Sequence, residues 1–93
     1  MTSGERPKAN FASLEPSFFV SKYVKRFFWG KDPAGMRRKE HMWIKIEFVT
    51  SRGTPRGTLQ NTPTLRMNVR HGDRVYCRLY QIEDVSSGEL RGN

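Results

Sequence analysis

The sequence contains a single cysteine, Cys77, among 93 residues, so the chain can form no internal disulfide. Small secreted domains usually depend on several disulfides, because their hydrophobic cores are thin. The first ten residues lack the apolar segment of a signal peptide, and the longest apolar cluster, residues 18–29, is interrupted by charged residues that prevent it from crossing a bilayer. These absences exclude a disulfide scaffold and favour a single cytoplasmic domain with no membrane partner.

Acidic residues are also scarce. Nine Asp and Glu residues stand against 17 Lys and Arg, which gives a net charge of +8. Residues 17–82 carry 14 basic and four acidic side chains, whereas residues 1–16 are neutral and residues 83–93 are acidic. The positive charge therefore belongs to the folded region and not to a tail. Such a field attracts anionic partners, although it also serves solubility alone.

Residues that carry out catalysis or bind metals are few. A structural zinc site needs about four N or S ligands, and the chain has two histidines and one cysteine with no closely spaced pair. A nucleophilic site could be assembled from Cys77, His71 and Asp73, but Cys77 lies in an apolar stripe and is better explained as a small hydrophobic residue. The adjacent acids Glu83 and Asp84 point to opposite faces of a strand and cannot flank one substrate bond. We therefore predict no enzymatic activity, no metal and no cofactor.

Residues 16–29 match the pattern of a helix. Ser13 suits the N-cap, Pro16 the first turn and Gly30 the position after the last turn. Two apolar stripes run at spacings of four residues, the first through Phe19, Tyr23 and Phe27 and the second through Val20, Val24 and Phe28. We predict a helix packed in the core, which is a commoner role for such aromatic stripes than base stacking.

Alternating apolar and polar residues predict short strands after this helix. The clearest alternation runs through residues 40–50, and shorter ones run through residues 58–60, 65–70 and 75–80. Glycine, proline and asparagine lie between these segments, as expected for the turns of an antiparallel sheet.

The predicted fold class is α+β, with one N-terminal helix packed on a small antiparallel sheet that could also curl into a partial barrel. The domain would span residues 11–85, between a disordered segment at residues 1–10 and a polar tail at residues 86–93. The predicted core combines the helix stripes with one face of the strands: Phe19, Val20, Tyr23, Val24, Phe27, Ile44, Ile46, Phe48, Val75, Cys77 and Leu79.

Two groups of residues form the candidate binding site. The first is a basic cluster before residues 40–50, made of Lys31, Arg37, Arg38 and Lys39. The second has the opposite parity to the apolar residues of the last two predicted strands and comprises Arg66, Arg70, Arg74, Tyr76, Arg78 and Tyr80. A sheet face that mixes arginine and tyrosine can contact phosphates and stack on bases. A charged outer face also keeps ordinary proteins soluble, and this simpler explanation stays open.

Four sequence blocks carry a resemblance to a known family. They are EHMWI at residues 40–44, GTLQNTP at 57–63, GDRV at 72–75 and QIED at 81–84. In order and spacing they resemble the YegJ-like family of uncharacterised bacterial domains, a domain of unknown function. The resemblance implies a small α+β domain of unknown activity. Family members often continue the last block with Asp-Trp, whereas Val85 follows Asp84 here, and no functional residue is carried over.

The favoured function is that of a small basic binding module that holds nucleic acid, either DNA or RNA, through its arginine and tyrosine residues. The alternative is a protein-interaction module, such as a phage- or plasmid-type inhibitor or an immunity-like protein, which docks on an acidic protein surface. Salt dependence separates the two, because polymer binding weakens steeply with salt in proportion to the phosphates neutralised.

Overall fold

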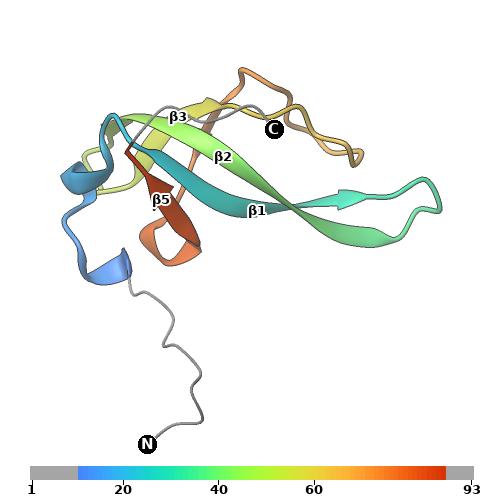
Figure 1. Cartoon of the computed structure of the whole chain (residues 1–93), viewed down its shortest axis with the longest axis horizontal. Coiled ribbons are helices and arrows are strands. Elements are labelled where there is room, and N and C mark those ends of the chain that lie inside the picture. The colour runs from blue at the N-terminus through green and yellow to red at the C-terminus, as the bar shows by residue number, and fades with distance from the viewer. Residues whose placement is uncertain (1–10, 88–93) are drawn as a thin grey trace, which may run out of the picture.

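The computed structural model describes residues 11–87 and is an all-β fold (Figure 1). Five strands form one open antiparallel sheet in the order β4-β3-β2-β1-β5. The strands are β1 (Tyr23–Lys31), β2 (Arg37–Val49), β3 (Pro55–Leu59), β4 (Arg74–Tyr76) and β5 (Asp84–Ser86). The predicted disordered segment, residues 1–10, and residues 88–93 of the predicted tail lie outside the described residues.

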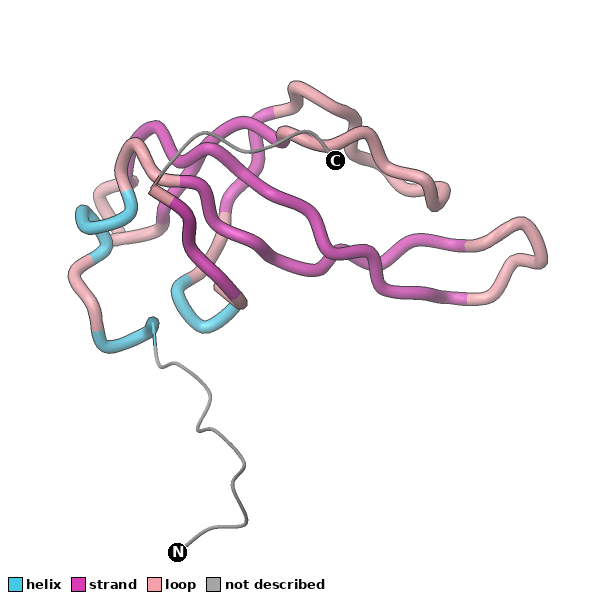
Figure 2. The backbone as a smooth tube through the Cα atoms, in the orientation of Figure 1, coloured by secondary structure: helices cyan, strands magenta, loops and turns pink. Residues whose placement is uncertain are grey.

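The predicted α+β class is wrong, because residues 11–87 contain short 3-10 turns and no α-helix. The turns are η1 (Phe11–Ser13), η2 (Pro16–Phe19) and η3 (Leu79–Gln81), drawn in cyan in Figure 2. The sheet has two separate edge strands, β4 and β5, and does not close into the barrel that we considered. No helix in this part of the chain is long and apolar enough to cross a membrane.

The predicted helix at residues 16–29 is replaced by the turn η2 and the strand β1. Residues four apart share one face of a helix, but they also share one face of a strand, because the period of a strand is two. The apolar stripes therefore fit both structures. Tyr, Val, Phe and Trp favour strands, and they make up five of the nine residues of β1. This propensity is consistent with the strand.

β1 and β2 form a long hairpin that projects from the rest of the sheet (Figure 1). The two strands are paired without interruption from Tyr23–Lys45 to Lys31–Arg37. Odd-numbered residues face outwards over this paired length, and none of them is fully buried. The even-numbered residues face the core, where Val24, Phe28, Met42, Ile44 and Ile46 are buried. The alternation predicted for residues 40–50 is thus confirmed as far as Ile46.

Phe48 departs from that alternation. The pairing of β2 with β3 shifts between Ile46 and Phe48, which marks a β-bulge. Phe48 pairs with Arg56 on the outward side, and 41% of its surface is exposed. The predicted burial of Phe48 is therefore wrong, because alternation in a sequence does not reveal where a bulge will change the parity.

β3 lies between β2 and β4, and its glycine is required by close packing. A Cβ atom at Gly57 would overlap the carbonyl group of Lys45 on β2. β3 covers the first part of the predicted strand at residues 58–60 and begins three residues earlier. The predicted strand at residues 75–80 shortens to β4, because the chain leaves the sheet after Tyr76 and enters η3.

Residues 60–73, which we call the crossing loop, replace the predicted strand at residues 65–70. The loop leaves β3 beside β2, where the Gln60 N–H donates to the Trp43 carbonyl at 2.9 Å. It then reaches the other edge of the hairpin, where Lys31 and Arg66 exchange two backbone hydrogen bonds of 3.0 Å. A Cβ atom at Gly30 would lie 2.7 Å from Leu65 Cβ, so glycine lets the loop lie against β1.

The carboxylate of Glu40 holds the crossing loop in place. It accepts hydrogen bonds from the Leu65 N–H at 2.9 Å, from the Thr64 N–H at 2.9 and 3.0 Å, and from the Thr64 hydroxyl at 3.0 Å. Burial raises the pKa of Glu40, but the hydrogen bonds from Leu65 and Thr64 together outweigh it and leave the pKa below its usual value.

The core lies on the inner side of the sheet, under the 3-10 turns and the crossing loop. Six predicted core residues are buried: Phe19, Val24, Ile44, Ile46, Val75 and Cys77. Four others are only partly buried, namely Val20, Tyr23, Phe27 and Leu79. Their places are taken by Phe28, Met42, Leu59 and Ile82. The differences in β1, at Tyr23, Phe27 and Phe28, follow from reading that strand with a period of 3.6 instead of two.

Phe28→Ala should lower the free energy of unfolding by about 3–5 kcal/mol, because it removes a ring that is 6% exposed from the core. Phe27→Ala is the matched control, since the same ring on the next residue lies on the outward side and is only partly buried. Its cost should be clearly smaller. Urea unfolding of both variants measures the difference, and equal losses would contradict the assigned parity of β1.

Glu40→Gln should lower the stability at neutral pH by about 1 kcal/mol, after allowance for partial exposure to solvent. The lowered pKa of Glu40 means that its stabilisation is present above the unfolded value of about 4.3 and is lost as pH falls through the folded value. The gap between wild type and variant should therefore close in acid. Urea unfolding from about pH 7 to about pH 3 measures it; a gap that is constant with pH would rule out this role for the carboxylate.

Candidate functional site

The outward side of the β1–β2 hairpin carries only aromatic and basic side chains over its paired length. We call this surface the outer face, and its residues are Tyr23, Lys25, Phe27, Trp29 and Lys31 of β1 with Arg37, Lys39, His41, Trp43 and Lys45 of β2. The register pairs them across the strands as Tyr23–Lys45, Lys25–Trp43, Phe27–His41, Trp29–Lys39 and Lys31–Arg37. An aromatic ring faces a lysine in three of these five pairs and His41 in a fourth, whereas the pair Lys31–Arg37 has no ring.

Cations lie directly over the rings of the outer face. The distance from the charged group to the ring centre is 4.2 Å for Arg37 on Trp29, 4.5 Å for Lys39 on Phe27, 5.4 Å for Lys45 on Tyr23 and 5.5 Å for Lys25 on Trp43. Phe27 and Trp29 also meet edge to face, with ring centres 5.8 Å apart. Trp29 is exposed to solvent on this surface, and Tyr23, Phe27 and Trp43 are partly exposed.

An open groove of about 460 Å³ lies at the far end of the outer face. Trp29, Lys31 and Arg37 line it from the hairpin, and Arg66 and Met67 line it from the crossing loop. The backbone bridge between Lys31 and Arg66 brings the two sides together. Three basic residues thus line the same groove as Trp29, which is 47% exposed.

Two carboxylates contact the outer face or its border, one at the central residue His41 and one next to Lys45. Glu83 Oε1 lies 2.8 Å from His41 Nδ1. Glu47 accepts a hydrogen bond of 2.9 Å from the Thr58 hydroxyl and lies 4.0 Å from Arg74. Among residues 11–87, none of the lysines of the outer face makes an ion pair. Their charge is available to an anionic ligand.

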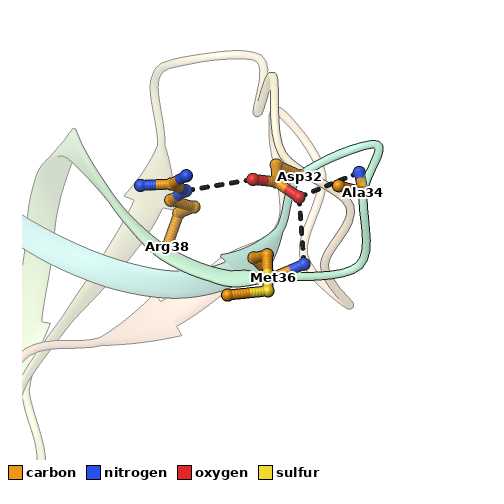
Figure 3. A network of polar contacts seen from close by, with 4 residues as sticks. All are labelled: Asp32, Ala34, Met36 and Arg38. Atoms are coloured by element: carbon orange, nitrogen blue, oxygen red, sulfur yellow. Dashed lines mark hydrogen bonds and ion pairs between the residues drawn. The ribbon is translucent and has the colours of Figure 1, made fainter.

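Asp32 fixes the tip of the hairpin and engages Arg38 (Figure 3). One carboxylate oxygen accepts hydrogen bonds of 2.9 Å from the N–H groups of Ala34 and Met36, and the other accepts one of 3.0 Å from Arg38 Nε. The hydrogen bond from Met36, followed by that from Arg38, lowers the pKa of Asp32. Arg38 was predicted as a binding residue, but it points to the side opposite the outer face and already has a partner.

The predicted arginine and tyrosine surface is divided among three places. Arg74 and Tyr76 are in β4, Arg66 and Arg70 are in the crossing loop, and Arg78 and Tyr80 follow β4 at the entrance to η3 and within it. All six are exposed, as predicted. Only two of them are in a strand, however, so they do not form one sheet face.

Two residues of the predicted basic cluster, Arg37 and Lys39, do lie together on the outer face, and Lys31 lies opposite Arg37. Sequence reasoning missed the residues that surround them, which are Tyr23, Lys25, Phe27, Trp29, His41, Trp43 and Lys45. The signal that could have found the β1 members is the period of two in residues 23–31, which sets Val24 and Phe28 apart from Tyr23, Phe27 and Trp29.

Cys77 is fully buried in the core, in agreement with its assignment to the apolar stripe. Burial raises the pKa of its thiol to about 12, against a smaller opposing effect of Arg26. Asp73, the third member of the nucleophilic site that we considered, accepts a hydrogen bond of 2.9 Å from the Arg70 N–H and shapes a turn. Within the described residues, no group of three or more His, Cys, Asp and Glu side chains could hold a metal ion.

Cys77 should react with a thiol reagent far more slowly in the native protein than in denaturant, because the thiol is inaccessible and stays protonated. The absorbance change on adding a chromogenic disulfide near pH 8, with and without urea, measures both rates. Rapid labelling of the native protein would show that the core opens at β4.

Comparison with known proteins confirms that the chain belongs to a family of uncharacterised bacterial domains. No curated protein and no solved structure matches the chain. The model of one family, described as an uncharacterized protein conserved in bacteria (DUF2314), matches residues 18–91. This match includes all five strands and the whole outer face. The chain therefore belongs to DUF2314, an uncharacterised domain family of bacteria.

Proposed function

We propose that this protein is a non-enzymatic module that binds single-stranded nucleic acid on the outer face of the β1–β2 hairpin. The observation that supports the proposal is that aromatic rings and basic side chains share one face of the hairpin, with a ring facing a lysine in three of the five cross-strand pairs. Aromatic rings stack on bases of any sequence, and cations between them contact the phosphates that link those bases.

Single strands fit this surface better than duplexes do. Bases inside a duplex are already stacked on one another, whereas unpaired bases can lie on exposed rings. Eight residue steps separate Tyr23 from Lys31, which at about 3.3 Å per residue gives a track of about 26 Å. A track of this length favours a site at the short end of the range of about 4–16 nucleotides known for single-strand binding domains.

A simpler explanation is that the rings and cations only stabilise the hairpin. Cross-strand pairs contribute about 0.2–1 kcal/mol each, and a projecting hairpin needs such support. Stability alone, however, does not require solvent-exposed residues such as Trp29, and β-branched residues would serve a strand as well. Ligand binding therefore has to be measured directly.

Within DUF2314 we propose that the chain belongs with the YegJ-like members, on the four sequence blocks at residues 40–84. We also propose that it acts in the cytoplasm of a bacterium or of a phage-infected cell, where single-stranded RNA and DNA are available. Neither proposal assigns a function to any residue, and the binding proposal does not depend on them.

Binding can be followed by intrinsic fluorescence, because both tryptophans of the chain, Trp29 and Trp43, lie on the outer face. A short single-stranded oligonucleotide should quench this emission, and a duplex of the same sequence should do so much less. Trp29→Ala should weaken binding by about 1–3 kcal/mol if a base stacks there. Tyr80→Ala is the control, since that ring is 76% exposed but lies in η3 and is not part of the outer face.

The contribution of charge is tested with Lys39→Ala, which should weaken binding to all sequences alike and reduce the salt slope by about one unit. Arg70→Ala removes one charge from the turn of the crossing loop and should change neither. If duplex and single strand bind equally, the stacking proposal is wrong. If the wild type binds neither at low salt, an acidic protein surface becomes the better hypothesis for the partner.

A further inference from the structure

A second basic site lies at the opposite end of β2, apart from the outer face of the hairpin. The turn between β2 and β3 and the end of β4 enclose an open pocket of about 300 Å³. Three arginines line it, Arg52 from the turn, Arg56 from β3 and Arg78 from the residue before η3. Tyr76 and Ser51, which carries a hydroxyl group, also line the pocket. The volume is within the range of small-ligand pockets, at its lower end.

The backbone around the pocket is held firmly. The Arg78 N–H donates to the Gln81 side chain at 2.9 Å, and the Gln81 N–H donates back to the Arg78 carbonyl at 2.8 Å. The Cys77 N–H donates to the Pro55 carbonyl at 2.9 Å, which ties the chain after β4 to the start of β3. The backbone that carries Arg56 and Arg78 is therefore fixed before any ligand arrives, and this lowers the entropic cost of binding.

The charge of the pocket is not neutralised within the protein. Among residues 11–87, neither Arg52, Arg56 nor Arg78 has a carboxylate oxygen within 4.0 Å. The Arg56 Nε–H group is buried and has no hydrogen-bond partner in that part of the chain. Arginine forks that converge without an acid repel one another, and a buried donor without a partner costs free energy.

A fourth arginine adds to the field without lining the pocket. Arg26 reaches across from β1 and donates a hydrogen bond of 2.8 Å to the Tyr76 carbonyl. Its guanidinium lies 5.6 Å from the Tyr76 ring centre, and that of Arg78 lies 5.4 Å from it. Both cations are thus gathered around one phenol ring, which is 42% exposed. The ring accommodates the cations but carries no full negative charge to balance them.

We propose that this pocket is a binding site for a phosphate monoester dianion, held by Arg52, Arg56 and Arg78 with the hydroxyl of Ser51. A phosphate group offers three acceptor oxygens and about two negative charges at neutral pH, which suits several arginine forks better than a single carboxylate does. The site is separate from the outer face and does not rest on the function proposed for that face.

The probe is inorganic phosphate, compared with chloride at equal ionic strength and pH. A ligand that binds the folded state alone raises the melting temperature, so phosphate should raise it in the wild type by more than chloride does. A calorimetric titration with phosphate then gives the affinity. Arg78→Gln should weaken it about tenfold, because one charge-assisted hydrogen bond is lost.

Arg70→Gln is the matched control, since it removes an exposed arginine that has no ion pair in the described residues and does not line the pocket. Its affinity for phosphate should equal that of the wild type. Arg52→Gln, in the exposed turn, provides a second test if Arg78→Gln does not fold. The proposal is overturned if phosphate and chloride act alike on the wild type, or if Arg70→Gln loses as much affinity as Arg78→Gln and Arg52→Gln.

Two oligonucleotides distinguish the sources of the phosphate group. A single strand with a 5′-phosphate should bind more tightly than the same strand with a 5′-hydroxyl, in an Arg78-dependent manner, if the natural ligand is the end of a strand. Equal binding of the two, with phosphate still stabilising the protein, would assign the pocket to a free or small phosphorylated molecule. Trp29→Ala should leave the response to phosphate unchanged in either case, so this site and the outer face can fail independently.

Discussion

The passage of the crossing loop over one side of the β1–β2 hairpin is the constraint on which the rest of the structure depends. A strand has two faces, and a two-stranded hairpin alone is marginally stable in water. The loop covers the even-numbered face through the close approach at Gly30 and the four hydrogen bonds on Glu40. Once that side is covered, the odd-numbered side must face solvent, and it is there that the rings and cations gather.

The sequence predicts the central strand well and the first strand badly, for one physical reason. In residues 40–46 the aliphatic residues Met42, Ile44 and Ile46 recur at every second position, and this order favours a period of two. In residues 23–31 both faces contain aromatic residues, so that Phe27 and Phe28 are equally apolar although one lies outside and the other in the core. Spacings of four then fit a helix as well as a strand. Propensity, which favours a strand for Tyr, Val, Phe and Trp, is the better guide where periodicity is ambiguous.

The sequence predicts some basic residues of the candidate site but does not predict the aromatic residues that lie next to them. Arg37 and Lys39 stand out as part of a basic cluster, and their parity places both on one face. Their aromatic partners come from β1, and only the register of the hairpin shows that Trp29 lies opposite Lys39. Arg66 reaches the same groove through a single backbone bridge in an irregular loop. Contacts of this kind depend on tertiary packing, and no local pattern in residues 65–70 encodes them.

A base that stacks on a ring of the outer face would have to move the cation that lies over that ring. Lys39 lies 4.5 Å from the Phe27 ring centre and Arg37 lies 4.2 Å from that of Trp29, so an arriving base has to displace them. A cation–π contact at an exposed site is worth about 0.5–1 kcal/mol, whereas a base stacked on an aromatic ring contributes about 1–3 kcal/mol. The exchange is therefore favourable, and it releases a charged group next to the phosphate of the same nucleotide. Each ring and its cation would then act as one unit, which accounts for the four cation–π pairs on this face.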